Sequence, residues 1–341
     1  MEEERTNAII GIAVIVMLVI AGAALWNTMD GDTPQESTGS LTLGVYAGDT
    51  SSLVYIAHEQ GFFGAHRLNV TLREYNSGKA AYDALLTGDV DVATATEFVY
   101  VSNSFAHHNL SIMGSIAITD EMNKLVARRD HGITAPDDLA GMTIGVTEKS
   151  AAEFYLGTFL LFNNLSLHDV TVVDLTPGQI VENLSNGGID AALTWEPNVY
   201  HVQQQLGSDA ITWPAQSDQD FYFVLASHDA WIANHAAIAE QLLAALVDAE
   251  QYVASHEHEA RRYIREYFNN TEAYLDVVWP IQRFRVTLPQ ALLLAMEQEA
   301  GWLIEQGLVS ATAIPNYYDD IYQQGLRAVQ PDAVTILGGK R

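Results

Sequence analysis

The sequence predicts an α/β protein of two similar lobes with parallel-rich sheets, preceded by one N-terminal transmembrane helix. Three observations support this prediction: a long stretch recurs about one hundred residues later, short apolar runs alternate with helical patterns, and a long apolar segment lies near the N-terminus. The chain has 341 residues, which is enough for one or two domains. The recurrence indicates that both lobes share one architecture.

The composition is globular and strongly acidic. Hydrophobic residues make up 48% of the chain and charged residues 17%, and the formal net charge is -27. Such a charge repels phosphate backbones, so nucleic-acid binding is disfavoured, and it is typical of proteins that remain soluble in a salty medium. Cysteine is absent, which excludes disulfides, thiolate nucleophiles and cysteine-ligated metals.

The N-terminal region predicts the compartment. Residues 8–26 are consecutively apolar or small and, at the rise of an α-helix, would cover about 28 Å, close to the thickness of a bilayer core. Residues 1–7 form a short flank, and residues 27–40 read as a tether. We expect a single-pass anchor that holds the folded part outside the cytoplasm. A cleaved signal peptide remains the alternative, because Ala21, Gly22 and Ala23 form an A-x-A triplet.

The recurring stretch organises the folded part. GDVDVATATE at 88–97 and GGIDAALTWEP at 187–197 align on Asp91 and Asp190, and the flanking sequence adds a strand, a Gly loop and an amphipathic helix in both copies. Each copy therefore predicts a β-α-β-α-β unit with right-handed crossovers.

We expect the chain to cross between the lobes twice. Residues 41–130 and 223–330 would form lobe 1 with the C-terminal helices, and residues 131–222 would form lobe 2. The two crossings would then act as a hinge.

Glu97 and Glu196 end corresponding strands in the two copies. The ligand crevice of an open parallel sheet lies beyond the carboxyl ends of its strands, so facing lobes would place both carboxylates in one cleft. The alternative is that each acid only stabilises the helix that follows it.

The same strand ends predict helix N-termini at the cleft. Free backbone N–H groups and small hydroxyl side chains there can bind an anionic head group without a formal positive charge, although a Ser or Thr at such a position is usually a plain helix cap. Trp195 offers either a flat face for a ligand or a core side chain. The remaining candidate ligand-binding residues are Asp49, Thr50, Ser51, Ser77, Gly78, Ser150 and Ala151.

Catalytic patterns are hard to find. The sequence has no G-x-S-x-G, H-E-x-x-H, P-loop or G-x-G-x-x-G motif. The eleven histidines are scattered, so we predict no catalytic residues, no metal site and no cofactor.

Several segments together resemble the solute-binding proteins of ABC importers in the nitrate, sulfonate, taurine and thiamine-pyrimidine-precursor group. They are LVYIAHEQGFFGAHRLNVTL, NSGKAAYDALLTGDVDVATATE, GITAPDDLAGMTIGVTEKSAAEFYL and DAALTWEP, and the resemblance spans about residues 41–310. It implies a periplasmic-binding-protein-like type II fold, a monomeric ectodomain and a permease partner with a separate ATPase. It also implies that loops at Ser51, Ser77, Glu97, Ser150 and Trp195-Glu196 line the cleft.

The sequence leaves the ligand open. Two carboxylates beside helix N-termini would suit an amine-bearing or heterocyclic solute better than a bare anion. A nitrate, alkanesulfonate or taurine receptor is the alternative, and an enzyme of the thiamine-pyrimidine or menaquinone type is the alternative from another class. An anchored sensor of the same solute is a third possibility.

Overall fold

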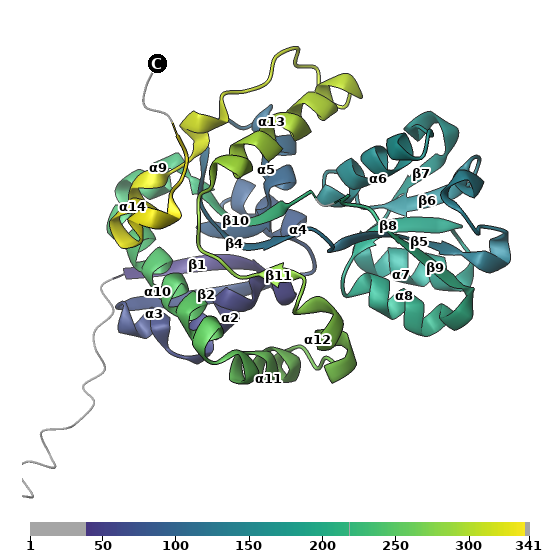
Figure 1. The fold of residues 1–341 in the computed structure, drawn as a ribbon. Helices are drawn as coiled ribbons and strands as arrows, with labels where there is room; N and C mark the ends of the chain where they lie inside the picture. The colour runs from purple at the N-terminus through teal and green to yellow at the C-terminus, as the bar shows by residue number, and fades with distance from the viewer. Residues whose placement is uncertain (1–38, 218, 338–341) are drawn as a thin grey trace, which may run out of the picture. The chain divides into compact units, whose positions relative to one another are not determined.

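The computed structural model describes residues 39–217 and 219–337 and contains two β-sheets with helices on both faces (Figure 1). The predicted anchor at residues 8–26 lies outside the described residues. Within the described part, no helix combines the length and the apolar character that a membrane crossing requires.

The first sheet has the strand order β11-β4-β10-β3-β1-β2 and the second β7-β6-β8-β5-β9. The strands of the first sheet are β1 (Gly39–Tyr46), β2 (Leu68–Tyr75), β3 (Val92–Thr96), β4 (Leu110–Thr119), β10 (Phe221–His228) and β11 (Gln282–Arg283). Those of the second are β5 (Asn123–Arg128), β6 (Thr143–Val146), β7 (Thr171–Asp174), β8 (Ala191–Trp195) and β9 (Ala210–Pro214). Residues 39 and 40, which the sequence assigned to the tether, belong to β1.

The internal duplication predicted from sequence matches the strand order. Strands β2-β1-β3 and β7-β6-β8 are parallel triplets in the same arrangement, and each is followed by one antiparallel strand, β10 or β5. Both antiparallel strands are the first elements after the chain has crossed from the other sheet. The sheets are thus mixed and less uniformly parallel than the βαβ pattern alone suggested.

Helices cover both sheets. The first half contributes α2 (Ser52–Glu59), α3 (Phe62–Ala65), α4 (Gly78–Leu86) and α5 (Glu97–Ser104). In the second sheet, α6 (Ala151–Phe162) lies on one face and α7 (Pro177–Asn186) and α8 (Asn198–Leu206) lie on the other (Figure 1). The C-terminal third adds α9 (Asp229–Asn234), α10 (Ala236–Ser255), α11 (Glu257–Tyr267), α12 (Glu272–Val278), α13 (Gln290–Glu305) and α14 (Gln323–Val329). Leu242, Leu243, Leu246 and Val247 of α10, whose helical spacing in the sequence predicts core packing, are buried, and Tyr252, predicted in the same way, is half-buried against the core.

The crossings lie between β4 and β5 and between β9 and β10. The first crossing falls about ten residues before the expected boundary at residue 130, because Lys124 and the apolar residues after it pair with β8 and β9 of the second sheet. An apolar strand pattern predicts that a segment forms a strand, but it does not predict which sheet that strand joins.

One buried side chain connects the two crossings. The Gln216 Oε1 atom accepts the N–H of Asn123 at 2.8 Å, and Gln216 Nε2 donates to the Thr119 carbonyl at 3.0 Å. Since Gln216 is fully buried, these bonds are shielded from water and hold both crossing segments in register.

Aromatic packing joins the lobes beside the crossings. Trp302 of α13 packs edge-on against Phe154 of α6, with ring centroids 5.4 Å apart, and also against Phe98 of α5. A side chain added at Gly157 of α6 would overlap the Trp302 ring, so glycine permits the close approach of these helices.

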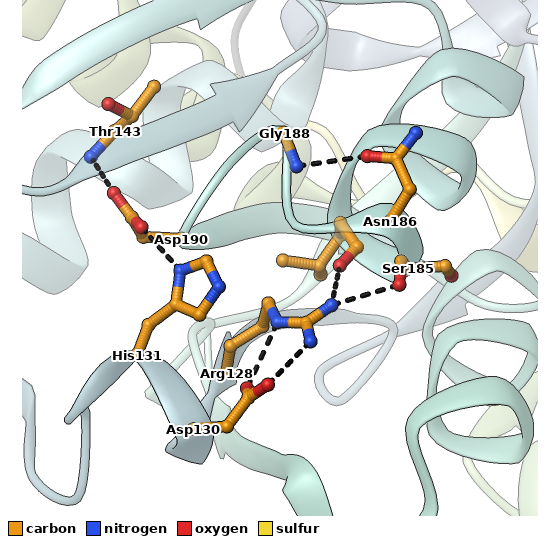
Figure 2. Close-up of polar contacts among 9 residues, drawn as sticks. Arg128, Asp130, His131, Thr143, Ser185, Asn186, Gly188 and Asp190 are labelled. Carbon is orange, nitrogen blue, oxygen red and sulfur yellow. Dashed lines mark hydrogen bonds and ion pairs between the residues drawn. The ribbon is translucent and has the colours of Figure 1, made fainter.

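The aspartate shared by the two copies has the same structural role in both. The Asp91 carboxylate accepts the N–H of Thr42 at 2.7 Å, and the Asp190 carboxylate accepts the N–H of Thr143 at 2.8 Å. Each bond ties a residue of one parallel strand, Thr42 inside β1 or Thr143 at the start of β6, to the turn before the neighbouring strand. Asp190 also contacts His131 Nδ1 at 2.6 Å, as Figure 2 shows. The repeated Gly-Asp pattern therefore serves strand registration.

Replacing this aspartate should destabilise the fold in a pH-dependent way. Burial raises the pKa of Asp190, but the bonds from Thr143 and His131 outweigh burial and leave it lowered. The stabilisation should therefore be complete above about pH 4 and be lost as the pH falls through the folded-state value. We expect Asp190→Asn to lower the free energy of unfolding by about 1–3 kcal/mol at pH 7 in urea titrations.

Asp137→Asn, at an exposed acid, is the matched control and should unfold like the wild type. Equal losses for both variants, or a loss at Asp190 that persists unchanged at pH 3, would contradict this role.

Candidate ligand-binding site

A pocket lies where the carboxyl ends of strands from both sheets meet. Its volume is about 40 Å³, whereas one water needs roughly 10–15 Å³, so this conformation accommodates a solute of only a few heavy atoms. Its lining from the first sheet and its helices comprises Tyr46, Asp49, Thr50, Ser77, Gly78, Lys79, Thr96, Val99, Phe221 and Phe223. Its lining from the second lobe and the first crossing comprises Met122, Asn123, Ser150, Ala151, Trp195 and Glu196.

Eight of the ten candidate residues from the sequence line this pocket, and two do not. Those in the lining are Asp49, Thr50, Ser77, Gly78, Ser150, Ala151, Trp195 and Glu196. Ser51 and Glu97 are fully buried and lie outside the lining. Contact of any of the ten with a ligand stays a prediction.

Helix N-termini from both lobes reach the pocket. Ser77 caps α4 by accepting the N–H of Ala80 at 3.1 Å, and Ser150 caps α6 by accepting the N–H of Ala152 at 3.3 Å. Both hydroxyls thus act as ordinary caps, and the partial positive charge of the two helix ends remains directed at the pocket. The Thr50 hydroxyl also lines the pocket and has no hydrogen-bond partner among the described residues.

Gly78 brings the α4 terminus close to β3. A Cβ atom at this position would lie 3.0 Å from the Cα atom of Ala95, which is backbone and cannot rotate away. Any larger residue would push the start of α4 from the sheet and alter the pocket wall.

Glu196 is buried and already compensated. Its Oε1 atom lies 3.1 Å from Lys124 Nζ, and its Oε2 atom accepts the N–H of Tyr200 at 3.0 Å. Lys124 belongs to β5, the antiparallel strand that enters the second sheet after the crossing. The Glu196 carboxylate therefore holds β5 through Lys124, and Glu196 also lines the pocket.

Glu97 fastens the other antiparallel strand. Its Oε1 atom accepts the N–H of Tyr222 in β10 at 2.8 Å, and Oε2 has no partner among the described residues. The two glutamates thus occupy matched positions in the duplication and both hold the strand that enters their sheet. We expected both carboxylates to line one cleft. Glu196 does line the pocket, whereas Glu97, the first residue of α5, is fully buried and points into the interior instead.

Asp49 is the other carboxylate in the lining. It lies at the start of the first helical turn after β1 and is 4% exposed. Tyr274 donates a short hydrogen bond to its Oδ2 atom, and Asn270 Nδ2 lies 3.4 Å from its Oδ1 atom. Among the described residues, the side chains that hydrogen-bond to Asp49 are neutral, whereas Glu196 is paired with a lysine.

The partners of Asp49 also reach the second lobe. The Tyr274 ring packs edge-on against Tyr200 of α8 at 5.2 Å between centroids, and the Tyr200 hydroxyl lies 3.2 Å from the Thr271 hydroxyl at the start of α12. Tyr274 and Asn270 were missed from sequence because they lie more than 220 positions from Asp49 in a helical region without a recognisable motif.

Trp195 links the two halves of the pocket. Its indole N–H donates to the Tyr46 hydroxyl at 3.0 Å, and Tyr46 packs edge-on against Phe223 at 5.9 Å between centroids. The sequence left open whether Trp195 packs in the core or forms a ligand surface. The residue is half-buried against the core and is also part of the pocket wall.

The charge of Asp49 costs stability. Burial raises its pKa to about 6, the Tyr274 hydrogen bond opposes this change, and the negative charge of Glu196 adds to it. A carboxyl group whose folded pKa is raised contributes stability that is present below pH 4 and is lost as the pH rises through about 6. Residues kept at such a cost are frequent in functional sites.

Asp49→Asn should therefore raise the unfolding midpoint relative to the wild type at pH 8 and leave it nearly equal at pH 4. The asparagine keeps an oxygen that can accept from Tyr274. Thermal unfolding of the full-length protein across this pH range measures the difference. A variant that is less stable than the wild type at pH 8 would show that the buried carboxylate stabilises the fold.

Comparison with known proteins identifies relatives of this chain. A protein of Brucella abortus (strain 2308) named as a binding protein is 23% identical over 208 residues, which cover 59% of this chain and 63% of that protein. The chain thus spans less than two thirds of that relative's length.

Solved structures show the same fold. The alkanesulfonate-binding protein SsuA from Xanthomonas axonopodis bound to MOPS has a TM-score of 0.73 at 16% identity and covers 83% of this chain and 98% of its own. The nitrate-binding protein NrtA from Synechocystis PCC 6803 has a TM-score of 0.69 at 14% identity and covers 90% and 93%. The desulfurization enzyme DszB also shares the fold, with a TM-score of 0.61 at 16% identity over 86% and 99%.

The resemblance predicted from sequence is confirmed at the level of family and fold. The family model for NMT1-like proteins matches residues 34–268, which is more than half of the sequence. This chain belongs to the NMT1-like family.

Proposed function

We propose that this protein is the solute-binding component of an ABC importer, and that its two lobes close on a small solute carrying an ammonium or N–H group. The pocket between lobes that are joined by two crossings supports a receptor of this kind, and relatives with sulfonate- and nitrate-binding names share the fold. A permease with a separate ATPase would be its partner.

The observation that carries the solute class is the buried carboxylate of Asp49. Glu196 is paired with Lys124, and Lys79, which also lines the pocket, lies 2.7 Å from Asp83. Among the described residues, the side chains that bond to Asp49 are all neutral. A ligand ammonium or ring N–H would provide the missing charge-assisted hydrogen bond, whereas a bare anion would be repelled.

Other groups in the pocket lining favour an acidic group. The N-termini of α4 and α6 direct partial positive charge at the pocket, and the Thr50 hydroxyl is free to donate. A zwitterion would satisfy both preferences. The sequence suggested that Glu97 and Glu196 together bind the ammonium or N–H group. We propose instead that Asp49 binds it and that the helix N-termini bind the acidic group of the solute.

We further propose that residues 8–26 anchor the protein in the cell membrane and hold the folded part outside the cytoplasm. The length and apolar character of this segment support the proposal. A receptor for nitrate or for alkanesulfonates without an amine is the competing solute class. Taurine, which the sequence analysis grouped with that alternative, carries an ammonium group and therefore belongs here to the proposed class. DszB shows that the fold can also serve an enzyme.

Taurine and ethanesulfonate form a matched probe pair, because they differ in the ammonium group alone. In calorimetric titration of the full-length protein at pH 7.5, we expect taurine to bind more tightly than ethanesulfonate. Asp49→Asn should weaken taurine binding by roughly 10- to 100-fold, the range for a charged hydrogen bond, and should not weaken ethanesulfonate binding. Taurine affinity should also fall as the pH drops through about 6 and Asp49 becomes protonated.

Asp137→Asn serves again as the surface control. Nitrate or ethanesulfonate binding that equals or exceeds taurine binding and survives Asp49→Asn would contradict the proposed solute class and leave a receptor for bare anions. Turnover of taurine, detected by product analysis, would contradict a purely binding role.

A further inference from the structure

A second group of buried acids lies outside the ligand pocket, where α5, α6 and α13 pack together. Glu97 of α5 is 0% exposed and Glu299 of α13 is 1% exposed, and Tyr155 of α6 is equally buried. Four oxygen atoms in this group have no hydrogen-bond partner among the described residues: Glu97 Oε2, Glu299 Oε1, Glu299 Oε2 and Tyr155 Oη. Buried polar atoms almost always have partners, so this concentration requires an explanation.

The three side chains influence one another electrostatically. Burial raises the pKa of Glu299 well above its usual range, and the charge of Glu97 raises it further. Burial likewise raises the pKa of Tyr155, and the charges of Glu97 and Glu299 add to this effect. Ring packing places the three side chains in one neighbourhood. Phe98, Phe154 and Trp302, which lie beside them on the same three helices, are in mutual contact with centroids 5.4, 5.7 and 6.1 Å apart.

The other charged and titratable groups around this cluster do not neutralise it. Asp220, in the second crossing, adds negative charge near Glu97 and Tyr155 and is itself paired with Arg283. Tyr222 of β10 and Tyr317 are the remaining titratable neighbours, and burial raises the pKa of both. Among the described residues, the main electrostatic influences on Glu97, Glu299 and Tyr155 come from burial, acids and hydrogen bonds, and none comes from a lysine, arginine or histidine.

Protonation is the competing explanation, because a protonated carboxyl group could donate its O–H to the other carboxyl group. It would leave the remaining oxygens without a donor, since no described N–H or O–H group bonds to either Glu299 oxygen. A set of oxygen ligands without an opposing donor is the environment that hard cations prefer.

We propose that Glu97, Glu299 and Tyr155 bind a monovalent cation such as Na⁺ between the two lobes. Two carboxylates and a phenol are too few acidic ligands for a typical divalent cage. In line with this, no cluster of three or more His, Cys, Asp or Glu side chains in residues 39–217 and 219–337 is placed to hold a metal. The strongly acidic chain would raise the concentration of cations around itself.

The location gives the cation a role in joining the lobes. Glu97 and Glu299 belong to helices that pack on the first sheet, and α6, which carries Tyr155, packs on the second. The other oxygen of Glu97 binds the N–H of Tyr222, directly after the second crossing. A cation at this position would therefore tie α6, whose N-terminus reaches the pocket, to the helix that anchors β10. The proposal does not depend on the identity of the solute.

The test is thermal unfolding of the full-length protein at pH 8 in NaCl and in choline chloride of equal ionic strength, because choline is too large to enter a buried oxygen site. With Na⁺ in about 100-fold excess over its dissociation constant, we expect the midpoint in NaCl to be higher by roughly 5 °C. Since protons compete for the carboxylates, this increment should shrink as the pH falls to 6.

Glu299→Gln should abolish the Na⁺-specific increment, and Tyr155→Phe, which removes one ligand oxygen and preserves the ring packing, should reduce it. Glu305→Gln changes an exposed acid at the end of α13 and should retain the full increment, which controls for cation binding to the acidic surface. Equal midpoints in both salts for the wild type would overturn the proposal. So would an increment that survives in Glu299→Gln and Tyr155→Phe, or an equal stabilisation of Glu299→Gln in both salts, which is the behaviour of two protonated acids.

Discussion

The two crossings between the sheets, bonded to each other through Gln216, are the constraint on which the rest of the structure depends. Gln216 belongs to the second crossing. Its side-chain amide bonds to Asn123 and Thr119, which flank the first crossing. Strand ends from separate sheets can form one pocket only if the crossings fix how those sheets face each other. Closure of the lobes would have to move these same bonds, which makes the crossing region the expected hinge.

The duplicated chain uses its repeated residues for this architecture. Asp91 and Asp190 register the parallel strands, while Glu97 and Glu196 hold the antiparallel strand that enters each sheet. The second copy compensates its glutamate with Lys124. The first copy offers Glu97 only backbone N–H groups, so this carboxyl group and its neighbour Glu299 carry the electrostatic cost of burial. At this matched position, the second lobe therefore has an ion pair, Glu196 with Lys124, and the first lobe has the unpaired acid Glu97.

Much of this organisation could be predicted from the sequence, and the limits have physical reasons. The recurrence at Asp91 and Asp190 predicted two matched units, and the rule that ligands lie beyond strand ends predicted most of the pocket lining. The direction of Glu97 could not be predicted, since the first residue of a helix can face the crevice or the core with the same sequence pattern. The sheet that Lys124 joins depends on long-range pairing. Tyr274 and Asn270 reach Asp49 only through the packing of the C-terminal helices, which no local pattern encodes.

Membership of the NMT1-like family and the shared fold agree with a receptor whose lobes meet over a ligand. Under the proposed function, the uncompensated Asp49 would give that receptor a preference for a solute with an ammonium or N–H group. The most direct test of this account is hydrogen–deuterium exchange of the full-length protein with and without saturating taurine. The account predicts that protection appears together at the turn containing Asp49, at the N-terminus of α4 and at the N-terminus of α6, because all three border one chamber. Protection confined to one lobe, or located away from the strand ends, would contradict it.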